Sequence, residues 1–277
     1  MNAYRHLFHA GNFADVFKHI VLSRLILRLQ GKKTPFLYLD THSGAGRYDL
    51  THAWAKKNSE FKLGADIILG ATNYPDELKE YMHLLRSENL NGRLDSYPGS
   101  PVLARNLLRA QDRLVLNELN KNDNSELTVV AKNWSRTSVR MEDGFKLLNA
   151  ALPPNERRGL IFIDPSFDQP NEFQRITDAL RLGIKKFRTG VFAVWYPVIN
   201  ERVCDRFIAE IKKLIPGAAL RLEIHLPRGA FLGRMHACGM LIINPPYLID
   251  SDAGLVGNWL VDILVKNNRG TFKSEFI

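Results

Sequence analysis

Four apolar runs in this sequence end in an acidic residue, a pattern that can build a site for a polar ligand. The four acids are Asp40, Glu118, Asp143 and Asp164. If the runs are buried parallel strands, their carboxyl ends meet at one edge of a sheet. The first run, FLYLDTHSGAG over residues 36–46, continues into a turn whose glycines let the backbone approach a ligand. This pattern is typical of a nucleotide-type cofactor site, and a tight strand-to-helix turn is the alternative interpretation.

Regular alternation of apolar runs and amphipathic segments predicts the elements that position these acids. Predicted strands cover residues 36–40, 114–118, 137–141, 159–164, 190–195, 219–226 and 237–243. Predicted helices cover residues 12–31, 124–133, 144–152, 170–187, 200–215 and 253–264. The last two strands are joined by a short loop and form a hairpin. We therefore expect an α/β fold with a doubly wound, mainly parallel, seven-stranded sheet that contains one antiparallel strand.

The first helix and a long insertion complete the expected organisation. Asn12 can cap the first helix, with Asp15 three residues on, and Gly31 ends it. The second strand ends 78 residues after the first (118 − 40), which exceeds a standard βαβ unit. We assign this surplus to a small helical subdomain at 48–95, inserted in a single domain over 1–277 whose arm and helix at 1–31 contribute to the site. Ser100 is predicted to cap the next helix, with Pro101 at its first position.

Composition and charge restrict the class of protein. The 277 residues carry a net charge of +9, which favours a polyanion partner over a merely solvated basic surface. Residues 1–35 hold six Lys or Arg against one acid, and we expect this basic arm to bind nucleic acid. The two cysteines indicate neither a disulfide framework nor a metal cluster, so we expect a reducing compartment, the cytoplasm. We find no secretory signal and no apolar run long enough to span a membrane.

The terminal hairpin separates two kinds of nucleotide-binding sheet. A nicotinamide-binding Rossmann fold ends in a sixth parallel strand, whereas S-adenosylmethionine-dependent methyltransferases close the sheet with a hairpin. In the second kind, Glu118 would bind the ribose hydroxyls, Asp143 the adenine of the cofactor, and Asp164 would lie beside the methyl group.

The segment Asp164-Pro165-Ser166-Phe167 resembles the D-P-P-Y motif of amino-methyltransferases that act on adenine. Together with YRHLFHAGNFADVFKH, YLDTHSGAGRY, YPGSP and AVWYPV, it makes essentially the whole chain resemble the ribosomal RNA large subunit methyltransferase J family. That family methylates the exocyclic amine, N6, of an adenine in 23S rRNA, and its members are also described as proteins needed for catabolism of external DNA. The resemblance implies S-adenosyl-L-methionine as cofactor, free 23S rRNA rather than the finished ribosome as partner, and a monomer.

The resemblance also implies residue roles. The methionine part of the cofactor is held by Lys18, His19, His42 and Ser100. The nucleoside part is held by Glu118, Asp143 and Gly144. The incoming adenosine is organised by Tyr4, His6 and Lys18. The target amine is held by Asp164 and the Pro165 carbonyl, and Phe167 stacks on the base; no metal is implied.

Two departures from the family motif keep other interpretations open. Ser166 replaces the second proline, and Phe167 keeps the ring of tyrosine without its hydroxyl. A DNA adenine methyltransferase, a methyltransferase of protein amides and a non-catalytic nucleic-acid-binding protein are the alternatives. A second motif, Asn244-Pro245-Pro246-Tyr247, matches the D-P-P-Y pattern better but follows an antiparallel strand, so we interpret it as structural.

Overall fold

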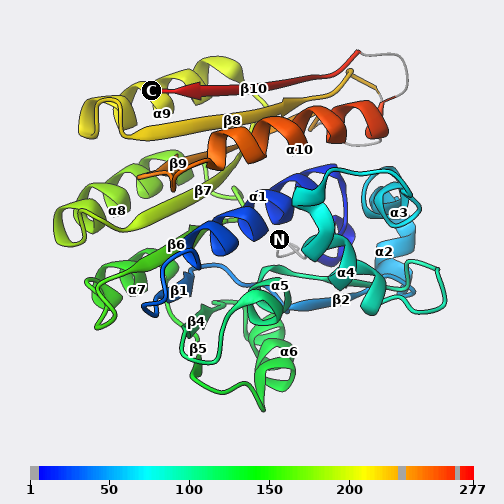
Figure 1. Cartoon of the computed structure of the whole chain (residues 1–277), viewed down its shortest axis with the longest axis horizontal. Helices are drawn as coiled ribbons and strands as arrows, with labels where there is room; N and C mark the ends of the chain where they lie inside the picture. Colours follow the sequence, from blue (N-terminus) through cyan, green and yellow to red (C-terminus); the bar gives the residue numbers. More distant parts are fainter. Residues whose placement is uncertain (1–5, 230–234, 266–268) are drawn as a thin grey trace.

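The computed structural model describes residues 6–229, 235–265 and 269–277, and the central feature of these residues is an eight-stranded sheet (Figure 1). The strand order is β10-β8-β9-β7-β6-β1-β4-β5. The five parallel strands are β1 (Leu37–Asp40), β4 (Arg113–Asn117), β5 (Thr137–Arg140), β6 (Gly159–Ile163) and β7 (Val191–Pro197). This arrangement confirms the prediction of a doubly wound α/β sheet, with each predicted strand within three residues of its observed bounds.

The far side of the sheet differs from the prediction in strand number. Strand β9 (Ala237–Ile243) runs antiparallel between β7 and β8 (Ala219–His225), as expected for a closing hairpin. An eighth strand, β10 (Thr271–Phe276), pairs antiparallel with β8, so the expectation of seven strands with one antiparallel strand is wrong. The sequence TFKSEF gives little signal because this edge strand is largely exposed and mostly polar.

Helices cover both faces of the sheet because the side chains of its parallel strands are apolar on both sides. Helices α1 (Phe13–Leu29), α5 (Ser100–Leu107), α6 (Lys121–Ala131) and α10 (Ile249–Leu264) pack on one face. Helices α7 (Gly144–Ala151), α8 (Glu172–Lys186) and α9 (Glu201–Leu214) pack on the other. In β1, Tyr38 contributes to the first core, whereas Leu37 and Leu39 contribute to the second. Figure 1 shows α1 and α10 side by side across the sheet.

The long connection between β1 and β4 is a set of short helices closed by a small hairpin-like pair of strands. Strand β2 (Arg47–Asp49) pairs antiparallel with β3 (Ser96–Pro98). Between them lie α2 (Ala53–Asn58), η2 (Glu60–Leu63), α3 (Ala65–Leu69), η3 (Asp76–Leu78) and α4 (Lys79–Ser87). Several of their apolar side chains join the core that contains α1. The division of 48–95 as a subdomain of its own remains a prediction.

The two predicted helix caps have different outcomes. Asn12 caps α1, and its side chain accepts a hydrogen bond from the Asp15 backbone N–H at 3.0 Å. Ser100 does not cap α5: the cap residue is Gly99, and the Ser100 hydroxyl donates to Asp40 instead, at 2.7 Å. The prediction was wrong because α5 begins one residue earlier than expected, so Ser100 is its first residue rather than its cap. No helix among the described residues is long and apolar enough to cross a membrane.

Candidate active site

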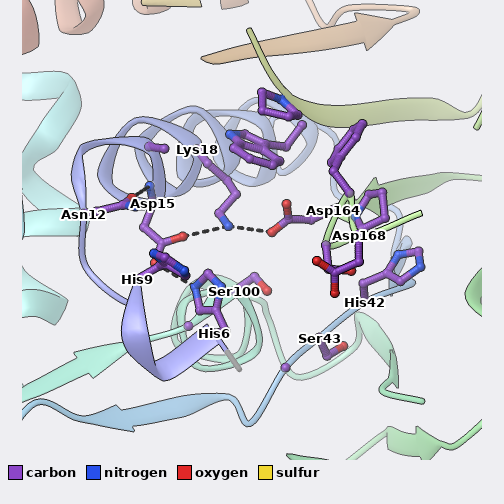
Figure 2. Close-up of a pocket in the computed structure, with 18 of the residues that line it drawn as sticks. His6, His9, Asn12, Asp15, Lys18, His42, Ser43, Ser100, Asp164 and Asp168 are labelled. Atoms are coloured by element: carbon purple, nitrogen blue, oxygen red, sulfur yellow. Dashed lines mark hydrogen bonds and ion pairs between the residues drawn. The ribbon is translucent and has the colours of Figure 1, made fainter. Parts of the chain in front are cut away.

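A cavity of about 720 Å³ opens at the carboxyl edge of the parallel strands. The loops that follow β1, β4, β5 and β6 line it, together with the start of α1 and the short helix η1 (His6–Phe8). Figure 2 shows residues of these segments pointing toward one another around it. The cavity brings together each predicted site residue in the described part of the chain, whereas Tyr4 lies outside the described residues.

The turn after β1 is held by a buried carboxyl. Asp40 accepts hydrogen bonds from the Tyr38 hydroxyl at 3.0 Å and from the Ser100 hydroxyl at 2.7 Å. Burial raises the pKa of Asp40 to about 7, although these hydrogen bonds oppose the shift. Gly44 has a φ of +60°, and a Cβ there would lie 2.1 Å from the Tyr48 hydroxyl, so the turn requires glycine. Asp40 therefore shapes the loop rather than lining the cavity.

Glu118 is fixed at the cavity wall by backbone donors. One carboxylate oxygen accepts from the Gly44 N–H at 2.8 Å, and the other accepts from the Asn120 N–H at 2.7 Å. Burial raises the pKa of this carboxyl, and the two backbone hydrogen bonds oppose that effect. Each oxygen keeps further acceptor capacity, so Glu118 can accept hydrogen bonds from a pair of hydroxyls.

Asp143 and Gly144 form the adjacent wall. Asp143 caps α7 through the Phe145 and Lys146 N–H groups, each at 3.0 Å. Its second oxygen pairs with Arg175 at 2.8 Å. A Cβ on Gly144 would lie 2.4 Å from the backbone oxygen of Thr41. The backbone at Gly144 therefore packs so closely against the loop after β1 that only glycine fits there.

The deepest part of the cavity holds a chain of ionised groups, which Figure 2 shows. The Lys18 ammonium lies between two carboxylates, 2.8 Å from Asp15 and 2.5 Å from Asp164. Asp15 also accepts from the ring of His6 at 2.8 Å and from the Gly11 N–H at 2.9 Å. Burial alone would lower the pKa of Lys18, but the two carboxylates outweigh it and raise that pKa. Lys18 is therefore a fixed positive charge that orients Asp164.

Asp164 and the residues after it form the loop expected to hold the target amine. Burial raises the pKa of Asp164, and the charge of Lys18 opposes this shift. Phe167 has a φ of +55°, a strained conformation for a bulky residue, which the surrounding contacts must maintain. Its ring packs edge-on against Trp195, with centroids 5.8 Å apart, and against Phe173 at 5.0 Å. Strain of this kind is common at functional loops.

Two predicted cofactor residues are histidines that line the cavity, of which His19 is buried and His42 is half-buried. The ring of His19 stacks on Tyr97 and hydrogen bonds to its hydroxyl at 2.8 Å, and burial lowers its pKa to about 3. His42 hydrogen bonds to the Thr41 hydroxyl at 2.8 Å, and burial lowers its pKa to about 4. Both rings are therefore neutral at pH 7, so they can serve as hydrogen-bonding groups but not as cations.

Sequence reasoning missed several residues that complete the site. Asp15 was noted only near a helix start, yet it anchors both His6 and Lys18. Arg175 and Trp195 also line the cavity. Trp195 lies in AVWYPV, one of the segments that carry the family resemblance, but no role was assigned to it, and the sequence around Arg175 contains no motif. An i, i+3 spacing of Asp15 and Lys18 on a predicted helix was the available signal.

The second D-P-P-Y-like motif lies at the opposite edge of the sheet, as predicted. It follows β9, whose last residue pairs with the start of β7. The Asn244 side chain donates to the carbonyls of Arg188 and Gly190, each at 2.8 Å, and thus joins two loops. None of its four residues lines the cavity.

The described residues of the expected basic arm do not form one surface, and Arg5 of that arm lies outside the described residues. Lys18 is buried, and Arg24 and Arg28 form ion pairs with Asp252. Lys32 and Lys33 are exposed beyond the far end of α1, whose 17 residues span about 25 Å. Arg109 donates hydrogen bonds to the backbone carbonyls of both lysines. These lysines therefore lie at the edge of the sheet away from the cavity. The prediction missed this because it counted charges along the sequence, whereas the helix separates them in space.

The cavity fits S-adenosyl-L-methionine on two observations. Glu118 presents a fixed carboxylate with free acceptor capacity, which suits a ribose diol. The carboxylates that line the cavity outnumber its lysine and arginine, Lys18 and Arg175, which suits a ligand that carries a positive sulfonium. Among the described residues, no group of three His, Cys, Asp or Glu side chains is arranged to hold a metal ion.

A parallel sheet closed by antiparallel β9, with an acidic residue at the cavity after each of β4, β5 and β6, defines a methyltransferase of the S-adenosylmethionine-dependent class. Residues 33–277 match the model of the family described as "Ribosomal RNA large subunit methyltransferase D, RlmJ", and the chain belongs to this family.

Named relatives and a solved structure agree with this assignment. The chain is 41% identical over 270 residues to "Ribosomal RNA large subunit methyltransferase J" of Escherichia coli K12, covering 98% of this chain and 96% of that protein. It is 36% identical over 278 residues to the protein of the same name from Haemophilus influenzae, covering 100% and 99%. The crystal structure of a Legionella pneumophila protein, 40% identical, matches with a TM-score of 0.90 and covers 97% of this chain and 98% of that one.

Proposed function

We propose that this protein transfers the methyl group of S-adenosyl-L-methionine to the exocyclic amine, N6, of an adenine in 23S ribosomal RNA. Family membership and the names of its relatives support the class of reaction and of substrate. The observation that carries the choice of an amine is Asp164, an oriented carboxylate in the cavity followed by the carbonyl of Pro165.

The cofactor supplies a methyl group activated by a sulfonium. Glu118 accepts hydrogen bonds from the ribose hydroxyls, and Asp143 with Gly144 holds the adenine. Lys18, His19, His42 and Ser100 hold the methionine part. In this assignment Ser100 acts partly through Asp40, to which its hydroxyl donates. The acid-rich lining of the cavity also favours a positively charged ligand.

The target amine is a weak nucleophile because its lone pair is delocalised into the adenine ring. Asp164 and the Pro165 carbonyl accept its two hydrogens, which favours a tetrahedral nitrogen and stabilises the positive charge that develops in the transition state. Lys18 holds Asp164 in place, and Asp15 and His6 hold Lys18. Phe167 offers a ring to a base drawn out of its helix. Positioning and electrostatics therefore carry the reaction.

A second candidate function is nucleic-acid binding without catalysis, and Ser166 is the observation that favours it. Proline at this position would fix the backbone that presents the Pro165 carbonyl, whereas the exposed Ser166 leaves it freer. A DNA adenine substrate uses the same amine and the same site.

We further propose that the partner is rRNA before assembly into the finished ribosome, that the protein acts as a monomer, and that it works in the cytoplasm. A base must leave its stack to reach Asp164 at the back of a cavity, and this costs least in RNA that is not yet packed by ribosomal proteins.

The test is a mass-spectrometric map of 23S rRNA from cells with and without this protein. The proposal expects one adenine whose N6 methyl group is absent when the protein is absent. In parallel, labelled cofactor is offered with unmodified rRNA, DNA and protein. Transfer to DNA or protein but not to rRNA would contradict the proposed substrate, and no transfer to any of them would favour the non-catalytic alternative.

A further inference from the structure

Next to the cavity, α2 carries an exposed aromatic ring that the proposed chemistry does not use. Trp54 is 39% exposed and stacks on Phe8, with ring centroids 5.6 Å apart and an angle of 18° between the ring planes. The rings of His52 and Trp54 meet edge-on, with centroids 5.2 Å apart, and the His52 Nδ1 accepts a hydrogen bond from the Trp54 backbone N–H. Trp54 is therefore held in one orientation by two neighbouring rings.

The place of this ring follows from η1. His6 and His9 line the cavity, and in a 3₁₀-type turn residues three apart lie on one side. Phe8 comes from the same turn but does not line the cavity. Glu60, two residues after the end of α2, returns to the cavity and bonds to His9 at 3.0 Å. Trp54 thus packs on the turn that lines the cavity without lining the cavity itself.

Charge separates the two places. The cavity is lined by eight carboxylates against one lysine and one arginine, Lys18 and Arg175, so it admits a neutral base more readily than a phosphate. The eight are Asp15, Glu60, Glu118, Asp123, Asp143, Asp164, Asp168 and Glu172. Helix α2, in contrast, has the sequence AWAKKN, with two exposed lysines and no acid. Lys57 is three residues after Trp54 and so shares its face of the helix.

We propose that Trp54, supported by Phe8, is a stacking platform for a base that neighbours the target adenosine, and that Lys57 contacts the phosphate beside that base. This rests on the proposed function, because it assigns to the same site an unstacked, single-stranded stretch of RNA. A base drawn into the cavity leaves its neighbours without a stacking partner, and an aromatic face replaces that partner whatever the neighbouring base is.

The test compares Trp54→Ala, Trp54→Phe and Lys57→Glu with the parent on an unmodified 23S rRNA transcript. We expect Trp54→Ala and Lys57→Glu to raise the KM for RNA about tenfold, within the range of a lost base stack, and Trp54→Phe to stay near the parent. The cofactor Kd and kcat should change less than about twofold. Tyr247→Ala is the matched control, an exposed aromatic at the opposite edge of the sheet, and should keep the parental KM. Thermal unfolding checks that each variant is folded.

A binding measurement separates this inference from the proposed function. Single-stranded oligoadenylate should quench part of the tryptophan fluorescence of the parent, and that part should be absent in Trp54→Phe while the affinity is retained. If the parent binds and quenches in this way but methylates no RNA, the platform stands and the proposed function fails. If RNA is methylated with an unchanged KM in Trp54→Ala and the quenching persists in Trp54→Phe, the platform is refuted and the function stands.

Discussion

Replacing Lys18 by methionine removes the ammonium that lies between the carboxylates of Asp15 and Asp164. The side chains of Lys18, Asp15 and Asp164 are 5%, 3% and 13% exposed, so water replaces little of the lost interaction. Removing one partner of a buried ion pair costs about 3–5 kcal/mol of stability. We expect about 3 kcal/mol, the lower end, because Asp15 keeps its bonds to His6 and the Gly11 N–H, and Asp164 can take up a proton.

That proton determines the effect on activity. The pKa of Asp164 is already raised by burial with Lys18 opposing it, so removal of Lys18 raises it further. A protonated Asp164 cannot stabilise positive charge on the amine, and we expect kcat to fall about 100-fold at pH 7. Activity should recover as the pH rises through the raised pKa. The free energy of unfolding of Lys18→Met should instead fall as the pH rises. The pKa of Asp164 is higher in the folded than in the unfolded state, so deprotonation of this carboxyl costs stability.

The assay is single-turnover methylation from pH 6 to pH 9, with urea unfolding at each pH. Lys32→Met is the matched control, an exposed lysine beyond the far end of α1, and should match the parent in both measurements. Methylation by Lys18→Met at the parental rate and with the parental pH profile would refute the claim that Lys18 orients and ionises Asp164.

The other predictions concern the cofactor wall, the buried ring, the motif and the opposite edge. Glu118→Ala should weaken cofactor binding by about 1–3 kcal/mol, and an unchanged Kd by calorimetry would contradict the role of this carboxylate. His19→Gln should reduce the loss of stability as the pH falls below 6.5, because the parent's buried ring has a lowered pKa and takes up a proton only when the protein unfolds. Urea unfolding at several pH values tests this, and an unchanged dependence of the unfolding free energy on acid pH would contradict it. Ser166→Pro should keep or raise activity, measured as kcat, and a loss in a folded variant would show that the serine is needed. Asn244→Ala should lower the free energy of unfolding by about 1–3 kcal/mol while methylation stays parental, since its side chain joins two loops far from the cavity.

The central sheet and the acids at its edge could be predicted because strong local rules act there. A strand buried on both faces reads as a continuous apolar run, and the acid that ends it marks the carboxyl edge, as at Asp40 and Asp164. Strand β10 could not be predicted in this way, because an exposed edge strand needs no apolar pattern in its sequence. Its position depends on pairing with β8, which no local window contains.

The same distinction applies within the site. Lys18 and Asp164 were assigned separately, by family resemblance, but their ion pair joins residues 146 positions apart. The role of Ser100 changed for the same reason, since its hydroxyl bonds to a carboxylate 60 positions away rather than to its own helix. Charge along residues 1–35 suggested one basic arm, and only the course of α1 shows that Lys18 is buried while Lys33 lies at the other edge. Contacts between distant segments decide such questions, and composition does not.

The central claim is that Asp164 acts on the target amine, and single-turnover methylation of an unmodified 23S rRNA fragment by Asp164→Ala tests it most directly. The parent and Asn244→Ala should each place a methyl group on N6 of one adenine, identified by mass spectrometry. Asp164→Ala should bind the RNA with parental affinity and transfer no methyl group, because the carboxylate acts on developing charge rather than on the phosphate backbone. Methylation by Asp164→Ala, or loss of methylation in a folded Asn244→Ala, would contradict the account.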